Sequence, residues 1–446
     1  MFVDSATLQD LEVVPTPAAR GTTLWSLIDR TRSRVGGDAL RKRLLNPPHT
    51  TEAILALQRA HQAISAESNA YRLALDAAAA DQVERYLGMT WQLPGDMPPM
   101  ARFRAWYRQY LQELERGRTS VASLLQSAVD LRGRLARADP LLLRELGDSI
   151  ADLVQDAAVR ELHRLGSYGN SASNLRFDQV ARERASTKLA DLLQVVGQLE
   201  ALWSVGAATL EHGWSYPRLS SQLRVTELVH PFLGRTAVSN DLHLDPRVRV
   251  CFVTGPNMAG KSTFLKATAL SLLLAHLGSG VPAASMEFAP VGTLFSSVQI
   301  ADSLSAGESF YLAEVRRIGA LAAALEDHGS AVAVVDEPFR GTNVHDAAEA
   351  TLAVITRLAA HPAALVFVAS HVAEVVPAIL DDPRIALLNF AADVAGDRPR
   401  FDYRLREGVS DQRLGMTLLR QEGVLDRLER SAGSATPGVA SSKAAF

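Results

Sequence analysis

The sequence of 446 residues contains a single cysteine, Cys251. One thiol cannot form an intramolecular disulfide, and it cannot build a cysteine-rich zinc site, so both frameworks are excluded. The chain must therefore fold through noncovalent packing. A chain without disulfides is typical of the reducing interior of a cell, and we expect a cytoplasmic protein.

Long apolar runs are absent as well. The longest, around 267–277 and 363–369, fall short of the roughly 18 residues that a membrane-spanning helix requires. The first 20 residues include Asp4, Asp10 and Glu12, and they lack the basic flank and apolar core of a signal peptide. We expect neither a membrane segment nor export by that route.

No excess of positive charge marks the whole chain, because 46 Lys and Arg residues are set against 49 Asp and Glu residues. Net charge alone therefore does not indicate a nucleic-acid partner. Two segments are locally basic. The first contains Arg30, Arg32, Arg34, Arg41, Lys42 and Arg43. The second contains Arg102, Arg104, Arg108, Arg116 and Arg118, with the aromatic residues Trp106, Tyr107 and Tyr110 between them. Each segment is compatible with a phosphate-binding face, and equally with a solvated helix face whose arginines pair with Asp and Glu.

The composition, 47% apolar and 21% charged, is typical of a folded globular protein, and the length allows two to four domains. Apolar side chains recur at helical spacing from about 24 to 214, with breaks near Pro47, Pro94 and Pro140 that predict several helices. From about 216, short β-rich runs alternate with helical patterns. Strands are predicted at 248–254, 331–335 and 364–369, helices at 262–276 and 345–359, a hairpin at 385–394 and 400–405, and a loose tail at 431–446. The fold class is thus α + α/β, a helical half followed by a domain with a largely parallel sheet.

A phosphate-binding loop pattern, G-x-x-x-x-G-K-[ST], lies between the first predicted strand and the first predicted helix of this second half. It consists of Gly255, Pro256, Asn257, Met258, Ala259, Gly260, Lys261 and Ser262, followed by Thr263. Glycines allow backbone N–H groups to turn toward phosphates, the lysine neutralises β and γ oxygens, and the serine hydroxyl can bind Mg²⁺. This pattern predicts a nucleoside triphosphate site.

Two carboxylates, Asp336 and Glu337, follow the predicted strand at 331–335. Given Lys261 upstream, we interpret Asp336 as a group that holds Mg²⁺ and Glu337 as the group that polarises the attacking water. Without the phosphate loop, an acidic pair at a strand end would be read as an ordinary solvated turn.

Two further features have both a functional and a plain structural interpretation. His371 follows the predicted strand at 364–369, where it could sense a γ-phosphate or simply lie on the surface. The polar segment 302–309 precedes a helical run at 310–325, so Ser309 and its backbone could bind an anion or cap that helix.

These motifs together resemble the DNA mismatch-repair MutS family. The run TGPNMAGKST at 254–263 is similar to the family's narrow version of the phosphate loop, and DEPFRGT at 336–342 resembles its D-E-x-x-R-G-T segment. VPA at 281–283, GES at 307–309 and SH at 370–371 match further family motifs, and 24–45 looks like the start of the family's lever domain. The likeness covers about 21–428.

The resemblance implies an ABC-type ATPase that forms a homodimer around ATP and Mg²⁺ and acts on DNA in repair or recombination. Ser309 would act in the partner's site, Asp336 with Ser262 would support the metal, Glu337 would activate water, and His371 would report the γ-phosphate. Val238 stands near the position of the family's adenine-stacking aromatic. Other repair proteins are further expected partners, and association with the nucleoid is compatible with the cytoplasmic location.

The resemblance also implies a division into an amino-terminal extension (1–20), a lever-like helical domain (21–220), an ATPase domain with a carboxy-terminal dimerisation segment (221–430) and a flexible tail (431–446). The Phe-x-Glu wedge with which the family reads mispairs is missing, since none of the 14 phenylalanines is followed two positions later by glutamate. The alternative is a nucleotide-gated module that binds a protein or RNA and never touches DNA.

Overall fold

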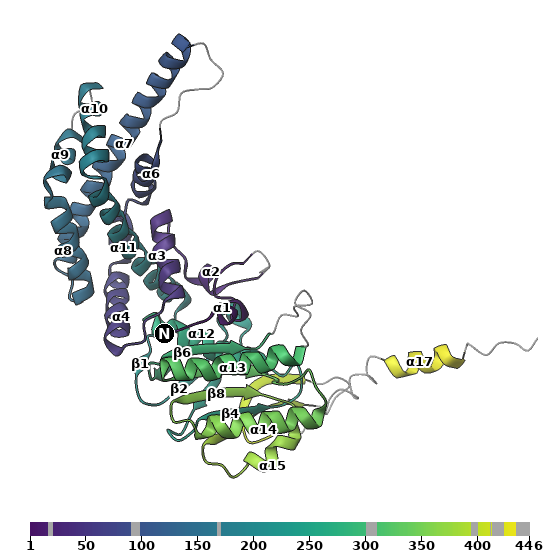
Figure 1. Cartoon of the computed structure of the whole chain (residues 1–446). Coiled ribbons are helices and arrows are strands. Elements are labelled where there is room, and N and C mark those ends of the chain that lie inside the picture. Colours follow the sequence, from purple (N-terminus) through teal and green to yellow (C-terminus); the bar gives the residue numbers. More distant parts are fainter. Residues whose placement is uncertain are drawn as a thin grey trace, which may run out of the picture.

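The computed structural model describes residues 1–16, 21–90, 99–166, 171–299, 310–393, 400–410, 412 and 423–433. In the described part of 24–212 every regular element is a helix, and two β-sheets with covering helices follow from residue 218 (Figure 1). The predicted mixture of helix and sheet is therefore confirmed. None of the described helices is long and apolar enough to cross a membrane.

The helical half is organised around α11 (Ser186–His212), which is buried on most sides. Its sequence is apolar around the whole helix rather than along one stripe, as expected of a helix enclosed by others. The other helices of this half are α2 (Leu24–Ile28), α3 (Arg34–Leu45), α4 (Thr51–Ala66), α5 (Ser68–Ala74), α6 (Ala77–Gly88), α7 (Pro99–Leu135), α8 (Leu141–Gln155), α9 (Ala157–Gly166) and α10 (Ser171–Gln179). A π-helical turn, η1 (Val180–Arg184), joins α10 to α11. The predicted breaks near Pro47 and Pro140 separate α3 from α4 and α7 from α8.

The larger sheet has six strands in the order β10-β9-β4-β8-β7-β6. Their bounds are β4 (Val250–Thr254), β6 (Thr293–Ser297), β7 (Ala331–Asp336), β8 (Ala364–Ala369), β9 (Ile385–Asp393) and β10 (Arg400–Glu407). All neighbours are parallel except β9 and β10, which form the predicted late hairpin. The predicted strands at 248–254, 331–335 and 364–369 correspond to β4, β7 and β8.

Both faces of this sheet are covered, which explains why its central strands read as unbroken apolar runs. Side chains alternate along β4, so Cys251 and Val253 pack toward α12 (Lys261–His276), whereas Val250 and Phe252 belong to the core beneath the other helices. That opposite face carries α13 (Phe310–His328) and α14 (Val344–Ala360), which Figure 1 shows lying across the strands.

A smaller four-stranded sheet of order β1-β5-β2-β3 lies beside the first. It contains β1 (Arg218–Leu219), β2 (Arg224–Leu228), β3 (Asn240–His243) and β5 (Ser285–Phe288), with a 3-10 segment, η2 (Pro231–Thr236), between β2 and β3.

At both ends of the chain, some residues expected to lie outside the folded domains form helices. Residues 1–13, part of the extension expected at 1–20, enter the main core, with Val3, Leu11 and Val13 buried around helix α1 (Ser5–Asp10). At the other end, α17 (Val424–Gly433) includes the first three residues of the expected loose tail. Residues 434–446 lie outside the described part.

A buried hydrogen-bonded contact joins the helical half to the sheet half. His61 on α4 is fully buried, and its Nδ1 lies 2.8 Å from the carbonyl oxygen of Gly278, which follows α12. Gly278 has a φ of +66°, and a side-chain Cβ there would lie 2.6 Å from the backbone nitrogen of Gln58. The close approach of the two halves therefore requires glycine at this position.

We predict that His61 makes stability depend on pH. Burial lowers the pKa of His61 to about 3, from 6.5 in the unfolded chain. Between these values the unfolded chain binds a proton that the folded protein does not, so stability falls as pH falls, by about 1.4 kcal/mol per pH unit. The variant His61→Asn, whose amide can still donate to Gly278, should lose about 2 kcal/mol less than the wild type between about pH 7.5 and about pH 5.

Thermal unfolding at the two pH values measures this difference. His345→Asn, at an exposed histidine on α14, is the matched control and should follow the wild type. Equal pH dependence of the wild type and His61→Asn would contradict the prediction.

Candidate functional site

The loop at 255–260 leaves the carboxyl end of β4 and leads directly into α12. Gly255 and Gly260 have φ values of 133° and 109°, and Met258 has a φ of 70°. A Cβ on Gly255 would lie 2.3 Å from the carbonyl oxygen of Phe390, so only glycine fits there. The loop curls over the amino terminus of a 16-residue helix, where unpaired N–H groups and the helix dipole favour an anion.

Lys261 lies inside this loop rather than in solvent. Its side chain is buried, and its Nζ donates to the carbonyl oxygens of Gly255 at 2.8 Å and of Pro256 at 3.2 Å. Burial lowers the pKa of Lys261, and the nearby carboxylates of Glu337 and Asp336 act in the opposite direction. A buried ammonium held only by neutral carbonyls is suited to an anionic ligand.

Asp336, the last residue of β7, faces the start of α12. Its Oδ2 accepts a hydrogen bond from the Ser262 hydroxyl, while its Oδ1 is buried and has no hydrogen-bond partner among the described residues. Burial raises the pKa of Asp336, an effect that the Ser262 hydrogen bond and Lys261 oppose. An unsatisfied carboxylate oxygen beside a hydroxyl fits Mg²⁺, which takes one or two protein oxygens together with waters and substrate phosphates.

Glu337 and His371 meet because they follow β7 and β8, which are neighbouring parallel strands. The carboxylate of Glu337 lies 3.3 Å from Nδ1 of His371 and 3.9 Å from the guanidinium of Arg340. Glu337 has a φ of 48°, in the left-handed region that non-glycine residues rarely adopt, and its N–H donates to the carbonyl of Ala369 at 2.8 Å. This backbone turn keeps Glu337 largely buried next to the exposed ring of His371.

The segment after Glu337 is tied to α13 by a buried carboxylate, that of Glu314. Glu314 accepts hydrogen bonds from the backbone N–H groups of Arg340 at 3.2 Å and Gly341 at 3.1 Å. Burial raises the pKa of Glu314, and these two N–H groups counteract that effect. Ser309, the predicted residue just before α13, lies outside the described residues.

A cavity of about 340 Å³ adjoins the loop on the side of β10. The predicted Val238 and Thr263 line it, and the full lining is Leu228, His230, Leu233, Thr236, Val238, Asn240, Gly260, Thr263, Phe264, Ala267, Phe390 and Tyr403. This lining is mostly apolar with a few polar groups, as is common for pockets that take the flat ring of a ligand.

Tyr403 is the residue of this cavity that sequence reasoning missed. The pairing of β9 and β10 shifts register between Phe401 and Leu405, and Tyr403 lies in that bulge with a φ of 57°. Asn240 on β3 holds the bulge, because its amide accepts from the N–H of Leu405 at 2.6 Å and donates to the carbonyl of Tyr403 at 3.1 Å. Bulges often redirect a side chain in this way, and here the ring comes close to Gly260.

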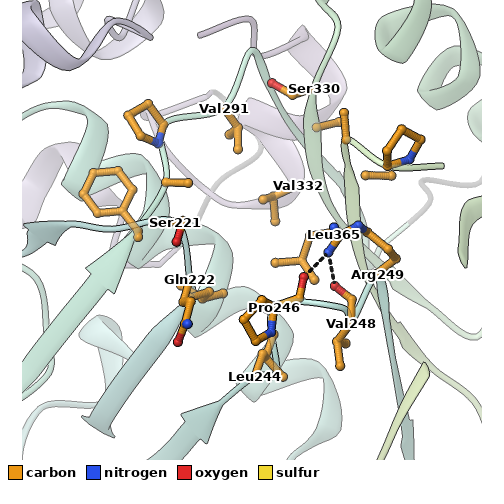
Figure 2. A pocket seen from close by; sticks show the side chains of 18 of the residues that line it. Ser221, Gln222, Leu244, Pro246, Val248, Arg249, Val291, Ser330, Val332 and Leu365 are labelled. Carbon is orange, nitrogen blue, oxygen red and sulfur yellow. Dashed lines mark hydrogen bonds between the residues drawn. The ribbon is translucent and has the colours of Figure 1, made fainter. Parts of the chain in front are cut away.

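A second cavity, of about 250 Å³, lies at the opposite, amino-terminal edge of the parallel strands (Figure 2). Val332 of β7 and Leu365 of β8 line it, and Arg249 donates from one nitrogen to the carbonyls of Pro246 and Val248, both at 2.8 Å. Among the described residues, none of the predicted site residues lines this cavity.

The two basic segments separate into paired and unpaired arginines. In the first segment, Arg30 pairs with Glu211 and Arg34 with Glu84, which supports the structural interpretation there. In the second segment, Arg116 pairs with Glu113 and Arg118 with Glu115.

Arg104 and Arg108 are exposed, and no ion pair is recorded for either in the described part of the chain. They flank Phe103 and Tyr107, which are 59% and 38% exposed and stack with ring centroids 6.1 Å apart. Trp106 and Tyr110 form a second stacked pair, with centroids 5.3 Å apart. This part of α7 thus presents aromatic rings beside two arginines that form no ion pair with the described residues.

Comparison with known proteins gives two similarities. Residues 251–436 match the family model described as MutS domain V. Proteins named DNA mismatch repair protein MutS from two strains of Chloroflexus aurantiacus, J-10-fl and Y-400-fl, are each 29% identical to this chain over 256 residues. The similarity covers 55% of this chain and 26% of each relative, so the chain spans about a quarter of the length of the curated relatives it matches.

We predict opposite effects of two glycine-to-alanine substitutions near the site. A Cβ on Gly341 would lie 2.6 Å from the backbone nitrogen of Tyr311, so Gly341→Ala must displace α13 or the loop after Glu337 and should cost about 1–3 kcal/mol. Gly319 on α13 has open space around its Cβ position, so Gly319→Ala should stabilise the helix by about 0.5–1 kcal/mol. Thermal unfolding compares the two, and a Gly341→Ala protein as stable as the wild type would show that the two segments do not pack as described.

Proposed function

We propose that this chain, whose residues 251–436 match MutS domain V, is a MutS-type ATPase that binds ATP with Mg²⁺, hydrolyses it, and uses the nucleotide to control a dimer that binds DNA. The observation that carries the proposal is the meeting of Lys261, Asp336 and Glu337 at the carboxyl edge of one sheet, with an unsatisfied Asp336 oxygen beside Ser262. Ligands of α/β sheets bind at that edge.

Each residue has a role that follows from its surroundings. The backbone N–H groups of the loop and the ammonium of Lys261 bind the phosphates, and on binding Lys261 exchanges its carbonyl partners for phosphate oxygens. Ser262 and Asp336 would hold Mg²⁺, which would supply positive charge against the phosphate oxygens. Glu337 accepts a proton from the attacking water, and His371, 3.3 Å from its carboxylate, orients it.

The base of the nucleotide occupies the cavity beside Tyr403. Tyr403 offers its ring as a stacking surface, while Val238 contacts the base edge at the other side of the cavity lining. The proposed stacking residue thus comes from β10 rather than from the segment before Asn240.

The dimer is the second part of the proposal. By resemblance to the family, Ser309 of one copy would lie against the nucleotide of the other, which would make two composite sites per dimer. ATP stabilises this dimer only by as much as it binds the closed state more tightly than the open one. We also propose a helical domain at 21–220, an ATPase domain at 221–430, and a dimer contact made by 413–428.

The aromatic surface of α7 is the proposed DNA contact. Arg104 and Arg108 supply charge for phosphates, and the exposed rings of Phe103 and Tyr107 supply stacking surfaces for bases in unpaired or branched regions. Arg116 and Arg118 are already paired and contribute less.

Two variants separate nucleotide binding from hydrolysis. Glu337→Gln should bind ATP and dimerise but lose hydrolysis by about 100-fold or more, since the amide cannot accept the proton of water. Lys261→Ala should weaken nucleotide binding itself, because it removes the only buried ammonium of the loop. Phosphate release and sedimentation with and without Mg–ATP measure both effects, and equal hydrolysis by Glu337→Gln and wild type would remove Glu337 from the mechanism.

Charge reversal on α7 tests the DNA contact. The double variant Arg104→Glu, Arg108→Glu should weaken binding to branched and single-stranded DNA and flatten its dependence on salt by about two phosphate contacts. Arg116→Glu, at a paired arginine on the same helix, is the matched control and should change binding little.

Mobility-shift titrations at two salt concentrations, with and without ATP, give the comparison. Absence of any shift by the wild type at low salt would favour the alternative, a nucleotide-gated module for a protein or RNA partner.

A further inference from the structure

A cavity of about 710 Å³ opens among the helices of the amino-terminal half, lined by residues of α3, α4, α6, α8 and α11. α3 supplies one side of it, because the lining positions 35, 38, 39, 42 and 43 recur at helical spacing and share one face of that helix. Much of the wall is apolar, and it includes Val35, Ala39, Ala56, Leu57 and Leu142. A space of this size is large enough for a small organic molecule.

Arg43 brings to this wall a positive charge that no described residue neutralises. Its Nη1 is buried and has no hydrogen-bond partner among the described residues. Burial lowers the pKa of Arg43 to about 10, and no carboxylate of the described residues opposes that effect. Taking a guanidinium out of water costs free energy unless an anion or a set of acceptors replaces the water. Arg43 therefore lacks the counter-ion that its surroundings require.

The two carboxylates that line the same cavity are engaged elsewhere. Asp38 and Glu84 both pair with Arg34, which is an exposed residue of α3. Neither of them compensates the charge of Arg43. The lining thus keeps its negative charges paired and leaves a positive charge available at Arg43.

Two amide side chains add polar groups to the wall. Gln194 and Gln198 lie one turn apart on α11, and both are exposed. No hydrogen bond of either side-chain amide is recorded in the part of the chain that the structure describes. Each amide can donate to an oxygen atom and accept from a hydroxyl. A few polar groups in a mostly apolar wall fix the orientation of a small ligand.

The cavity also adjoins the contact between the two halves of the protein. Leu57 lines it, and a Cβ placed on Gly278 would lie 2.9 Å from the Cβ of Leu57. Burial and then the charge of Arg43 lower the pKa of His61, whose Nδ1 contacts the carbonyl of Gly278. A ligand in the cavity would therefore act on the residues that join the helices to the sheets.

We propose that this cavity binds a small organic monocarboxylate, whose carboxylate pairs with the guanidinium of Arg43 and whose apolar body packs against Val35, Ala39 and Leu57. Guanidinium and carboxylate groups match in shape and charge, since two parallel N–H···O bonds can form between them. The site is separate from the phosphate-binding loop, and the inference does not rest on the proposed ATPase.

The charges of the lining favour a monoanion over a dianion. One arginine neutralises one negative charge, whereas Asp38 and Glu84 would repel a second one. A nucleic-acid strand is a poorer fit, because its phosphates are flanked by further charges and Nη1 of Arg43 is buried.

Calorimetric titration of the full chain with benzoate and with octanoate measures binding, in a buffer free of phosphate and of other carboxylates. We expect a dissociation constant of about 1 mM or tighter for one or both acids. Benzamide and octanamide, which keep the apolar body without the charge, should each bind at least about tenfold more weakly than the matching acid. Absence of binding by both acids, or tighter binding of the dianion phenyl phosphate, would overturn the inference.

Variants assign the binding to Arg43. Arg43→Met should lose about tenfold or more in affinity for the carboxylate, and Arg43→Lys, which keeps the charge without the planar fork, should recover part of it. Arg41→Met, at an exposed arginine of α3 outside the cavity lining, is the matched control and should bind as the wild type does. Lys261→Ala should also bind as the wild type does, because the probe does not use the phosphate-binding loop. Unchanged affinity of Arg43→Met, or lost affinity of Lys261→Ala, would contradict the proposal.

Thermal unfolding separates a ligand-binding role of Arg43 from a structural one. Without a probe, Arg43→Met should unfold at a higher temperature than the wild type, because an apolar chain replaces an unpaired buried charge. The bound carboxylate should raise the unfolding temperature of the wild type and leave that of Arg43→Met unchanged. A lower unfolding temperature of Arg43→Met without a probe would assign Arg43 to the fold instead of to a ligand.

A second variant tests the same cavity without touching the arginine. Ala56→Leu adds volume at the wall and should weaken carboxylate binding about tenfold or more, since the apolar body loses its space. A folded Ala56→Leu protein that binds the carboxylate as tightly as the wild type would place the probe outside this cavity and overturn the inference.

Discussion

The register of three parallel strands is the constraint on which the site depends. Val253 of β4 pairs with Ala369 of β8, and Ala369 pairs with Asp336 of β7, so the three strands end at one level. The loop after β4, the acidic pair after β7 and His371 after β8 therefore emerge side by side. A slip of one residue in any pairing would turn Asp336 to the other face of the sheet and separate it from Ser262. The apolar cores on both faces prevent that slip, because they specify which side chains of each strand are buried.

Local strain accompanies this alignment. Glu337 occupies a left-handed backbone conformation, and Lys261 is buried against carbonyl oxygens, while one oxygen of Asp336 has no hydrogen-bond partner among the residues that the structure describes. Each arrangement costs free energy in the protein alone. Together they describe a site that is prepared for an anion and a cation, since a bound phosphate chain with its metal would relieve the unfavourable burial of both charged groups.

Much of the architecture could be predicted from sequence because its signals are local. Apolar runs indicated β4, β7 and β8, and the phosphate-loop pattern indicated the turn between β4 and α12. Tyr403 could not be predicted in this way, because its place depends on a register shift in β10 and on hydrogen bonds to Asn240, 163 residues earlier in the chain. The role of residues 1–13 was equally hidden, since the contact of Asp10 with Val298 spans 288 residues and leaves no periodic pattern. The second basic segment shows the same limit, because only the structure separates Arg104 and Arg108 from arginines that are already paired.

A crystal structure of the protein with Mg²⁺ and a nonhydrolysable ATP analogue tests the central claim most directly. The account predicts the phosphate chain within the loop 255–263, the metal between Ser262 and Asp336, and the base against Tyr403. Analogue bound instead in the cavity beside Arg249, or a loop that Lys261 keeps closed at saturating nucleotide, would contradict it.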